Sequence, residues 1–126
     1  MKSSLATVIV ALAYLFAVLP PASAAQPFYA RAFQQAQAAG KTTFIHVGAS
    51  WCSTCKRQKP LLQQPEQELP DLVVYEVDFD TAKDVLKRLG VRYQTTLIVF
   101  RGAQEVARSV GETSASSIRA LVATGL

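Results

Sequence analysis

Cys52 and Cys55 are the only cysteines of the chain, and two residues separate them. A pair at this spacing can exchange disulfides with other thiols, close a short structural disulfide, or supply two sulfur ligands to a soft metal ion. The segment from Ser53 onward has a helical pattern, so Cys52 would meet the unpaired amides and the positive dipole of a helix start. Because that environment favours thiolate over thiol, the pattern predicts Cys52 as the nucleophile and Cys55, one turn along, as the resolving thiol.

Other uses of the cysteine pair stay open. As a structural staple it is weak, since closing a loop of about four residues contributes roughly 2 kcal/mol, against about 3 kcal/mol for fifteen. As a copper or zinc site, Cys52 and Cys55 need further ligands, for which the chain offers His46, its single histidine, or Thr95. The alternatives to a redox enzyme are therefore a metal-handling protein that uses the same cysteines, and a non-catalytic interaction module.

The first 24 residues are typical of a secretory signal peptide. Lys2 precedes an apolar run over 5–19, and two prolines and the small-residue string Ala22-Ser23-Ala24 follow. The apolar run is shorter than the roughly 20 residues that cross a bilayer as a helix, so cleavage is expected rather than stable membrane insertion. The sequence thus predicts a cleaved signal peptide over 1–24, a domain over 25–126, and export, in a bacterium to the periplasm.

Length and charge exclude several other classes of protein. A chain of 126 residues has room for one ordinary domain and none for a separate cofactor-binding module. Its 13 basic and 9 acidic side chains give a net charge of +4, and the basic ones are scattered rather than arranged as a stripe that follows a phosphate backbone. We therefore expect no nucleic-acid partner and no organic cofactor, and a monomer.

Apolar periodicity and turn residues predict an α/β domain. Helices are expected over 27–39, 53–64 with a kink at Pro60, 81–89, and from about Thr113 onward. Strands are expected over 42–47, 72–78, 96–100 and 105–110. A strand-helix-strand crossover followed by an antiparallel hairpin implies a mixed central sheet of four to five strands with helices on both faces.

The segment from Trp51 to Lys56, which follows a predicted buried strand, resembles the active-site motif of the thioredoxin family. Further matching features come in the same order along the chain: Pro60, the strand end Val77-Asp78-Phe79-Asp80, the strand over 96–100, and Gly111 before the last helix. The resemblance covers essentially the whole of 25–126. It implies a thioredoxin-like fold and a thiol-disulfide oxidoreductase that acts on protein thiols or disulfides through a redox-active Cys52-Cys55 disulfide. Net reduction in an oxidising compartment would also need a membrane redox partner.

The resemblance assigns roles to the residues around the cysteines. Ser53 and Thr54 lie between the two cysteines and would modulate the redox potential, and Lys56 would favour the Cys52 thiolate. The expected substrate-binding residues are Trp51, Gln94, Thr95 and Gly111.

Two positions depart from the thioredoxin pattern. His46 stands six residues before Cys52, where thioredoxins carry a buried acid, and an imidazole there could take the proton of Cys55. Gln94-Thr95 stands where the family has a cis-proline. A cis bond before Thr95 would cost about 3 kcal/mol, so a trans bond is expected, with the Thr95 hydroxyl placed to hydrogen-bond Cys52.

Overall fold

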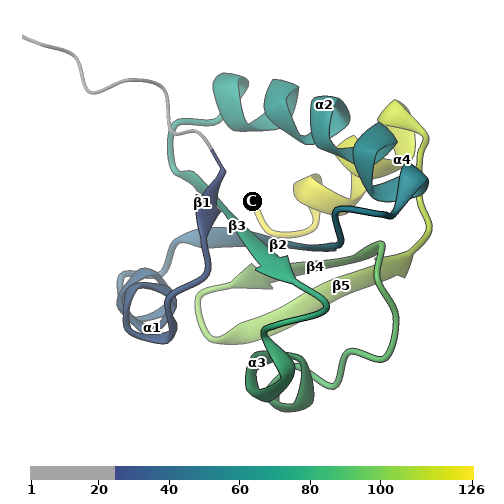
Figure 1. The fold of residues 1–126 in the computed structure, drawn as a ribbon. Helices are drawn as coiled ribbons and strands as arrows, with labels where there is room; N and C mark the ends of the chain where they lie inside the picture. The colour runs from purple at the N-terminus through teal and green to yellow at the C-terminus, as the bar shows by residue number, and fades with distance from the viewer. Residues whose placement is uncertain (1–24) are drawn as a thin grey trace, which may run out of the picture.

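A five-stranded β-sheet forms the frame of the protein in the computed structural model, which describes residues 25–126 (Figure 1). The predicted signal peptide over 1–24 lies outside the described residues. In chain order the elements are β1 (Gln26–Pro27), α1 (Ala30–Ala38), β2 (Thr42–Gly48), α2 (Ser53–Glu68), β3 (Leu72–Asp78), α3 (Lys83–Arg88), β4 (Thr96–Arg101), β5 (Gln104–Val110) and α4 (Ala115–Ala123).

The sheet is mixed, with the strand order β1-β3-β2-β4-β5. Strand β3 runs parallel to β1 and β2, whereas β4 runs antiparallel to both β2 and β5. All seven residues of β2 are buried, as expected of a central strand that is covered on both faces. The predicted fold class, a mixed sheet with helices on both faces, is confirmed.

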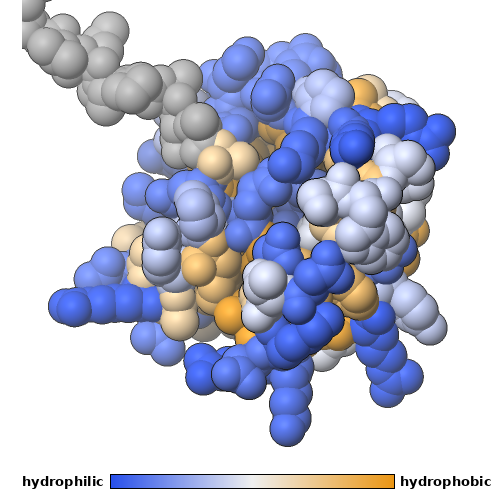
Figure 2. Space-filling model, viewed as in Figure 1, coloured by the Kyte–Doolittle hydropathy of each residue, from blue (hydrophilic) through white to orange (hydrophobic). Residues whose placement is uncertain are grey.

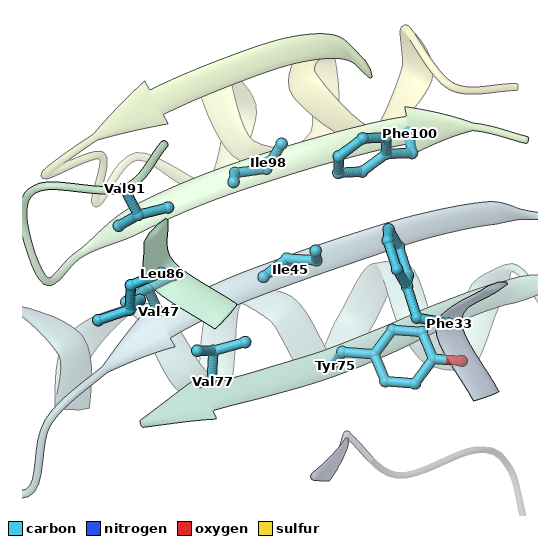
Figure 3. Close-up of a cluster of buried hydrophobic side chains, with 9 residues drawn as sticks. All are labelled: Phe33, Ile45, Val47, Tyr75, Val77, Leu86, Val91, Ile98 and Phe100. Carbon is cyan, nitrogen blue, oxygen red and sulfur yellow. The ribbon is translucent and has the colours of Figure 1, made fainter. Parts of the chain in front are cut away.

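Successive side chains of the strands alternate between two apolar cores, one on each face of the sheet. In one core, residues of β2, β3 and β4 pack against Phe33 of α1 and Leu86 of α3 (Figure 3). In the other, Phe44 of β2 and its neighbours pack against Leu62 of α2 and Ile118 of α4. Figure 1 shows these helix pairs on opposite sides of the sheet. The sheet thereby fixes α2, which carries the cysteines, over the face that contains Phe44.

Two boundaries differ from the sequence-based expectation. The first helix begins at Ala30, because Gln26 and Pro27 form an edge strand opposite Tyr75 and Glu76 of β3. A proline is compatible with an edge strand, where its missing amide breaks no ladder hydrogen bond. Helix α2 continues past Pro60 to Glu68. The helix is one turn longer than expected. We attribute this turn to its packing in the apolar core with Leu62 and Leu69, which the hydrophobic pattern of the segment does not reveal.

Polar side chains cover most of the face seen in Figure 2, and apolar residues show between them. Within residues 25–126, no helix is long and apolar enough to cross a membrane. The large apolar side chains that stay exposed include Trp51, at 59%, next to the cysteine pair.

Candidate active site

The cysteine pair lies where the chain leaves β2 and enters α2. Cys52 caps the helix in an extended conformation, with its amide donating to the Ala49 carbonyl at 3.1 Å. Its Sγ accepts a hydrogen bond of 3.1 Å from the amide of Cys55. A sulfur at this position takes the place of the oxygen acceptor that usually caps a helix, so the helix start stabilises negative charge on it. The helix start therefore favours the thiolate form of Cys52 in the reduced protein.

Cys52 and Cys55 are joined in a disulfide, with their Cα atoms 5.3 Å apart. Both residues are buried, Cys55 at 1% exposed and Cys52 at 5%. The two sulfurs also face different surroundings. Cys52 lines one hollow, whereas Cys55 lines another, whose walls include Lys56, Lys59 and Glu76.

The hollow beside Cys52 has a volume of about 370 Å³ and collects most of the site residues that the sequence predicted. Its walls are Trp51, Cys52, Ser53, Thr54, Arg57, Gln94, Thr95 and Gly111. Arg57 was not among the predicted site residues, and it brings the one charged side chain of this lining. Lys56 lies elsewhere, in the lining of the cavity that Cys55 reaches.

Trp51 is held by a hydrogen bond although it is largely exposed. Its Nε1 donates to Asp80 Oδ2 at 2.8 Å, in the turn that follows β3. That turn is itself organised by Asp78, whose carboxylate accepts from the amides of Asp80 and Thr81. The backbone and side-chain hydrogen bonds of Thr81 are the main reason why the pKa of Asp78 is lowered. The indole ring is thus a fixed apolar surface beside Cys52, and sequence reasoning had not singled out Asp80 as its support.

Thr95 adopts a left-handed backbone with a φ of +66°, the only non-glycine residue among 25–126 to do so. The peptide bond before it is trans, as expected, since the described residues contain no cis bond. For a β-branched residue this conformation costs about 1–2 kcal/mol, so the surroundings must hold it. The Thr95 amide donates to the Val47 carbonyl at 2.8 Å, and the Thr95 carbonyl accepts from the Gly111 amide at 3.1 Å.

The hydrogen bond expected between Thr95 and Cys52 is not formed. The Thr95 hydroxyl donates instead to the carbonyl of Gln94, its own chain neighbour. The left-handed backbone places that carbonyl within reach, and a local acceptor competes well for a threonine hydroxyl. The prediction of a Thr95 hydroxyl bonded to the sulfur was therefore wrong, although Thr95 does line the hollow.

His46 is fully buried and has a partner at each ring nitrogen. Nε2 lies 3.0 Å from Oε1 of Gln58, and Nδ1 lies 3.4 Å from Oε1 of Glu76. The Gln58 amide nitrogen donates to two backbone carbonyls, those of Thr95 and Glu112, so its oxygen is the atom left to accept from His46. This assigns a hydrogen to Nε2.

The His46 ring lies close to Cys55 across Gly48. A Cβ added at Gly48 would be 3.2 Å from His46 Cε1 and 3.6 Å from Cys55 Cβ, so glycine permits this close approach. In the disulfide form both ring nitrogens are engaged with Gln58 and Glu76. Proton transfer from Cys55 to His46 stays a prediction.

Glu76 connects His46 to the cavity that Cys55 lines. Its side chain is 29% exposed, and Oε2 lies 3.3 Å from Nζ of Lys59. Burial raises the pKa of Glu76, but the hydrogen bond and charge of His46, with the charge of Lys59, outweigh burial and lower it overall. The cavity has a volume of about 510 Å³, and its lining includes Cys55, Lys56, Lys59 and Glu76. Cys55 thus shares the lining of this cavity with Lys59 and Glu76, two charged residues that the sequence did not connect with it.

The metal alternative has no third ligand in this arrangement. Within residues 25–126, no group of three or more His, Cys, Asp and Glu side chains is placed to hold a metal ion. The hydrogen-bonding partners of His46 are Gln58 and Glu76, not the sulfurs.

Comparison with known proteins agrees with this geometry. The family model for thioredoxin matches residues 25–124. Thioredoxin-1 of Saccharomyces cerevisiae is 31% identical over 72% of this chain and 88% of its own length. Thioredoxin of Chlamydia trachomatis is 35% identical over 62% of this chain and 76% of its own.

Solved structures show the same relationship. The crystal structure of Trxlp from Edwardsiella tarda has a TM-score of 0.72 and 43% identity, over 78% of this chain and 97% of that protein. A mutant thioredoxin from Halobacterium salinarum has the same TM-score at 19% identity, which shows the fold alone. Because the family match takes in every element that builds the site, this chain belongs to the thioredoxin family, as a thiol-disulfide oxidoreductase that exchanges disulfides with protein thiols through its own cysteine pair rather than a cofactor.

Proposed function

We propose that this protein is an exported thiol-disulfide oxidoreductase in which Cys52 is the nucleophile and Cys55 the resolving cysteine. The observation that carries the assignment is the different surroundings of the two sulfurs. Cys52 caps α2, lines the hollow beside Trp51 and is 5% exposed, whereas Cys55 is 1% exposed and lines a different hollow. A substrate sulfur can approach Cys52 from the hollow, beside the exposed Trp51.

The reaction proceeds in two exchanges. The Cys52 thiolate attacks one sulfur of a substrate disulfide, forms a mixed disulfide, and releases the other substrate sulfur as a thiolate that takes a proton. The Cys55 thiolate then attacks Cys52 Sγ, closes the Cys52-Cys55 disulfide, and releases the second substrate sulfur. Two electrons pass from the cysteine pair to the substrate. The same steps in reverse transfer the disulfide to a substrate dithiol.

The hollow supplies the docking surface for an extended protein segment. Trp51 offers an apolar ring, and Gln94 and Gly111 line the same hollow, where their backbone can pair with an extended segment. Arg57 lies in the same lining and favours acidic side chains near the substrate disulfide. We propose that the protein acts as a monomer, because docking of this kind uses one copy of the hollow.

Export is proposed from residues 1–24, whose composition is that of a signal peptide. Cleavage after Ala24 leaves a chain that starts one residue before β1. The proposed compartment is the bacterial periplasm, where a membrane-borne partner would exchange electrons with the cysteine pair. Expression of the full chain in a bacterium, followed by fractionation and mass measurement, tests this. A periplasmic product that begins at Ala25 is expected, and an uncleaved cytoplasmic product would overturn it.

Single cysteine variants test the assignment of roles. Cys55→Ser should accumulate the mixed disulfide with a protein substrate, because the resolving thiol is absent, whereas Cys52→Ser should form none. Mass spectrometry after acid quenching identifies the adduct. If the reduced protein alkylates faster at Cys55 than at Cys52, the assignment is wrong. Copper or zinc bound stoichiometrically and tightly to the reduced protein would favour the metal-handling alternative instead.

A further inference from the structure

Gln58 lies on α2 one turn beyond Cys55 and is fully buried, which is uncommon for an amide side chain. A buried amide is tolerated only when its donors and acceptor are all bonded. The hydrogen-bond partners of the Gln58 amide therefore indicate its role.

Each group of the Gln58 amide has a partner on a different segment. Nε2 donates to the carbonyl of Thr95, before β4, at 3.2 Å, and to the carbonyl of Glu112, after β5, at 2.9 Å. Oε1 lies 3.0 Å from Nε2 of His46 on β2. One side chain on the helix of the cysteines thus links two loops and the central strand.

The two loops bonded by Gln58 form one wall of the hollow beside Cys52. Thr95 lines the hollow directly, and so does Gly111, the residue before Glu112. The loops are also bonded to each other, by the Gly111 amide and the Thr95 carbonyl. Among the described residues, the Gln58 amide is the side-chain hydrogen bond that joins α2 to both loops.

The hydrogen bond from Gln58 reaches Thr95, a residue with an unfavourable backbone conformation. Its φ of +66° is unfavourable for a β-branched residue, and its carbonyl accepts a hydrogen bond of 3.2 Å from Nε2 of Gln58. Loss of the amide donors would leave the Thr95 carbonyl with the Gly111 amide as its remaining partner. Thr95 would keep its bonds with Val47 and Gly111, but the wall would lose its side-chain bonds to α2 and could shift relative to Cys52.

We propose that Gln58 is a positioning residue for protein substrates, which sets the wall formed by Thr95 and Gly111 at the distance from Cys52 that an extended segment requires. The proposal rests on the proposed function and names a further residue of the same site. A protein substrate depends on both the wall and the sulfur. A small disulfide needs only the sulfur, so the two substrate classes separate the positioning role from the chemistry.

Gln58→Met removes the amide at nearly constant size and is the principal test. We expect the KM for insulin, with dithiothreitol as the electron donor, to rise about tenfold, which corresponds to about 1.4 kcal/mol. The kcat for insulin, the rate of exchange with oxidised glutathione, and the pH profile of Cys52 alkylation should stay within about twofold. Gln63→Met is the matched control. It makes the same substitution at a position of α2 whose side chain is exposed.

The outcomes separate this proposal from the proposed function. Wild-type protein that exchanges neither insulin nor glutathione overturns the proposed function itself. If the wild type is active and Gln58→Met leaves the insulin KM unchanged, or slows insulin and glutathione equally, only the positioning role fails. Should Gln58→Met not fold, Gln58→Glu replaces it, since its carboxylate can still accept from His46 and cannot donate to the two carbonyls. The same selective rise in KM is then required.

Discussion

Replacing Glu76 by Gln tests the contacts of its carboxylate with His46 and Lys59. The substitution removes one negative charge and keeps the size of the side chain. Glu76 faces Nδ1 of His46 at 3.4 Å on one side and Nζ of Lys59 at 3.3 Å on the other. We expect the free energy of unfolding at pH 7 to fall by about 1.5 kcal/mol.

The magnitude follows from the two contacts. A glutamine can keep a neutral hydrogen bond to His46, so the loss there is the difference between a charged and a neutral bond, about 1 kcal/mol. The Lys59 side chain is 56% exposed, and solvent screening limits its pair with Glu76 to about 0.5 kcal/mol. For a domain of about 100 residues the sum lowers Tm by roughly 6 °C.

The pH dependence gives the prediction its sign. The pKa of Glu76 in the folded protein lies below its ordinary value of 4.5: burial raises it, but the interactions with His46 and Lys59 outweigh burial. The folded state therefore binds fewer protons than the unfolded state near that pH. The stabilisation by Glu76 is fully present above the ordinary pKa and is lost as the pH falls through the lowered one. The difference between wild type and Glu76→Gln should accordingly shrink between pH 5 and pH 3.

Urea unfolding of both proteins across pH 7 to pH 3 measures this difference. Lys59→Met is the control, because it removes only the screened contact and should cost about 0.5 kcal/mol or less. The reasoning is refuted if Glu76→Gln costs no more than Lys59→Met at pH 7, or if its cost does not change with pH.

Three further substitutions follow from buried or strained positions. Glu66 is buried with one carboxylate oxygen that has no hydrogen-bond partner among the described residues, and burial raises its pKa to about 6. Glu66→Gln should therefore stabilise the protein by on the order of 1 kcal/mol at pH 7.5 and little at pH 5, as thermal unfolding at the two pH values would show. Gly125→Ala should destabilise by about 1–3 kcal/mol in urea unfolding, because the new Cβ would lie 2.5 Å from Cγ2 of Thr42. Thr95→Pro should destabilise by about 3 kcal/mol or more, because proline cannot adopt a φ of +66° or donate to Val47, and a Tm at or above that of the wild type would contradict this.

The central part of the fold is predictable because its signals are local. The β-branched runs that become β2 and β3 are bounded by residues that end strands, and the predicted strands match them closely. Strand β1 is different, because two residues carry no periodicity and it exists only through its pairing with β3. Pro27 was accordingly assigned to the first helix, although it lies in that edge strand.

The residues of the site likewise fall into those that the sequence predicts and those that depend on how the chain packs. The motif around Cys52 located the disulfide and the first helical turn, and the resemblance added Gln94, Thr95 and Gly111, which do line the hollow. Gln58 gave no comparable signal, since a glutamine in a polar helix usually faces solvent. Its contact with His46 depends on how α2 docks on the sheet, and that arrangement is set by apolar residues elsewhere on the helix, among them Leu62.

The two sulfurs are controlled by different groups. Cys52 Sγ accepts from the Cys55 amide at 3.1 Å and lies at the start of α2, so its charge is stabilised by the helix itself. Cys55 instead lines the cavity that also contains Glu76 and Lys59. Changes in the His46-Glu76 pair should for this reason act on the resolving step at Cys55 and leave the first attack by Cys52 nearly unaltered.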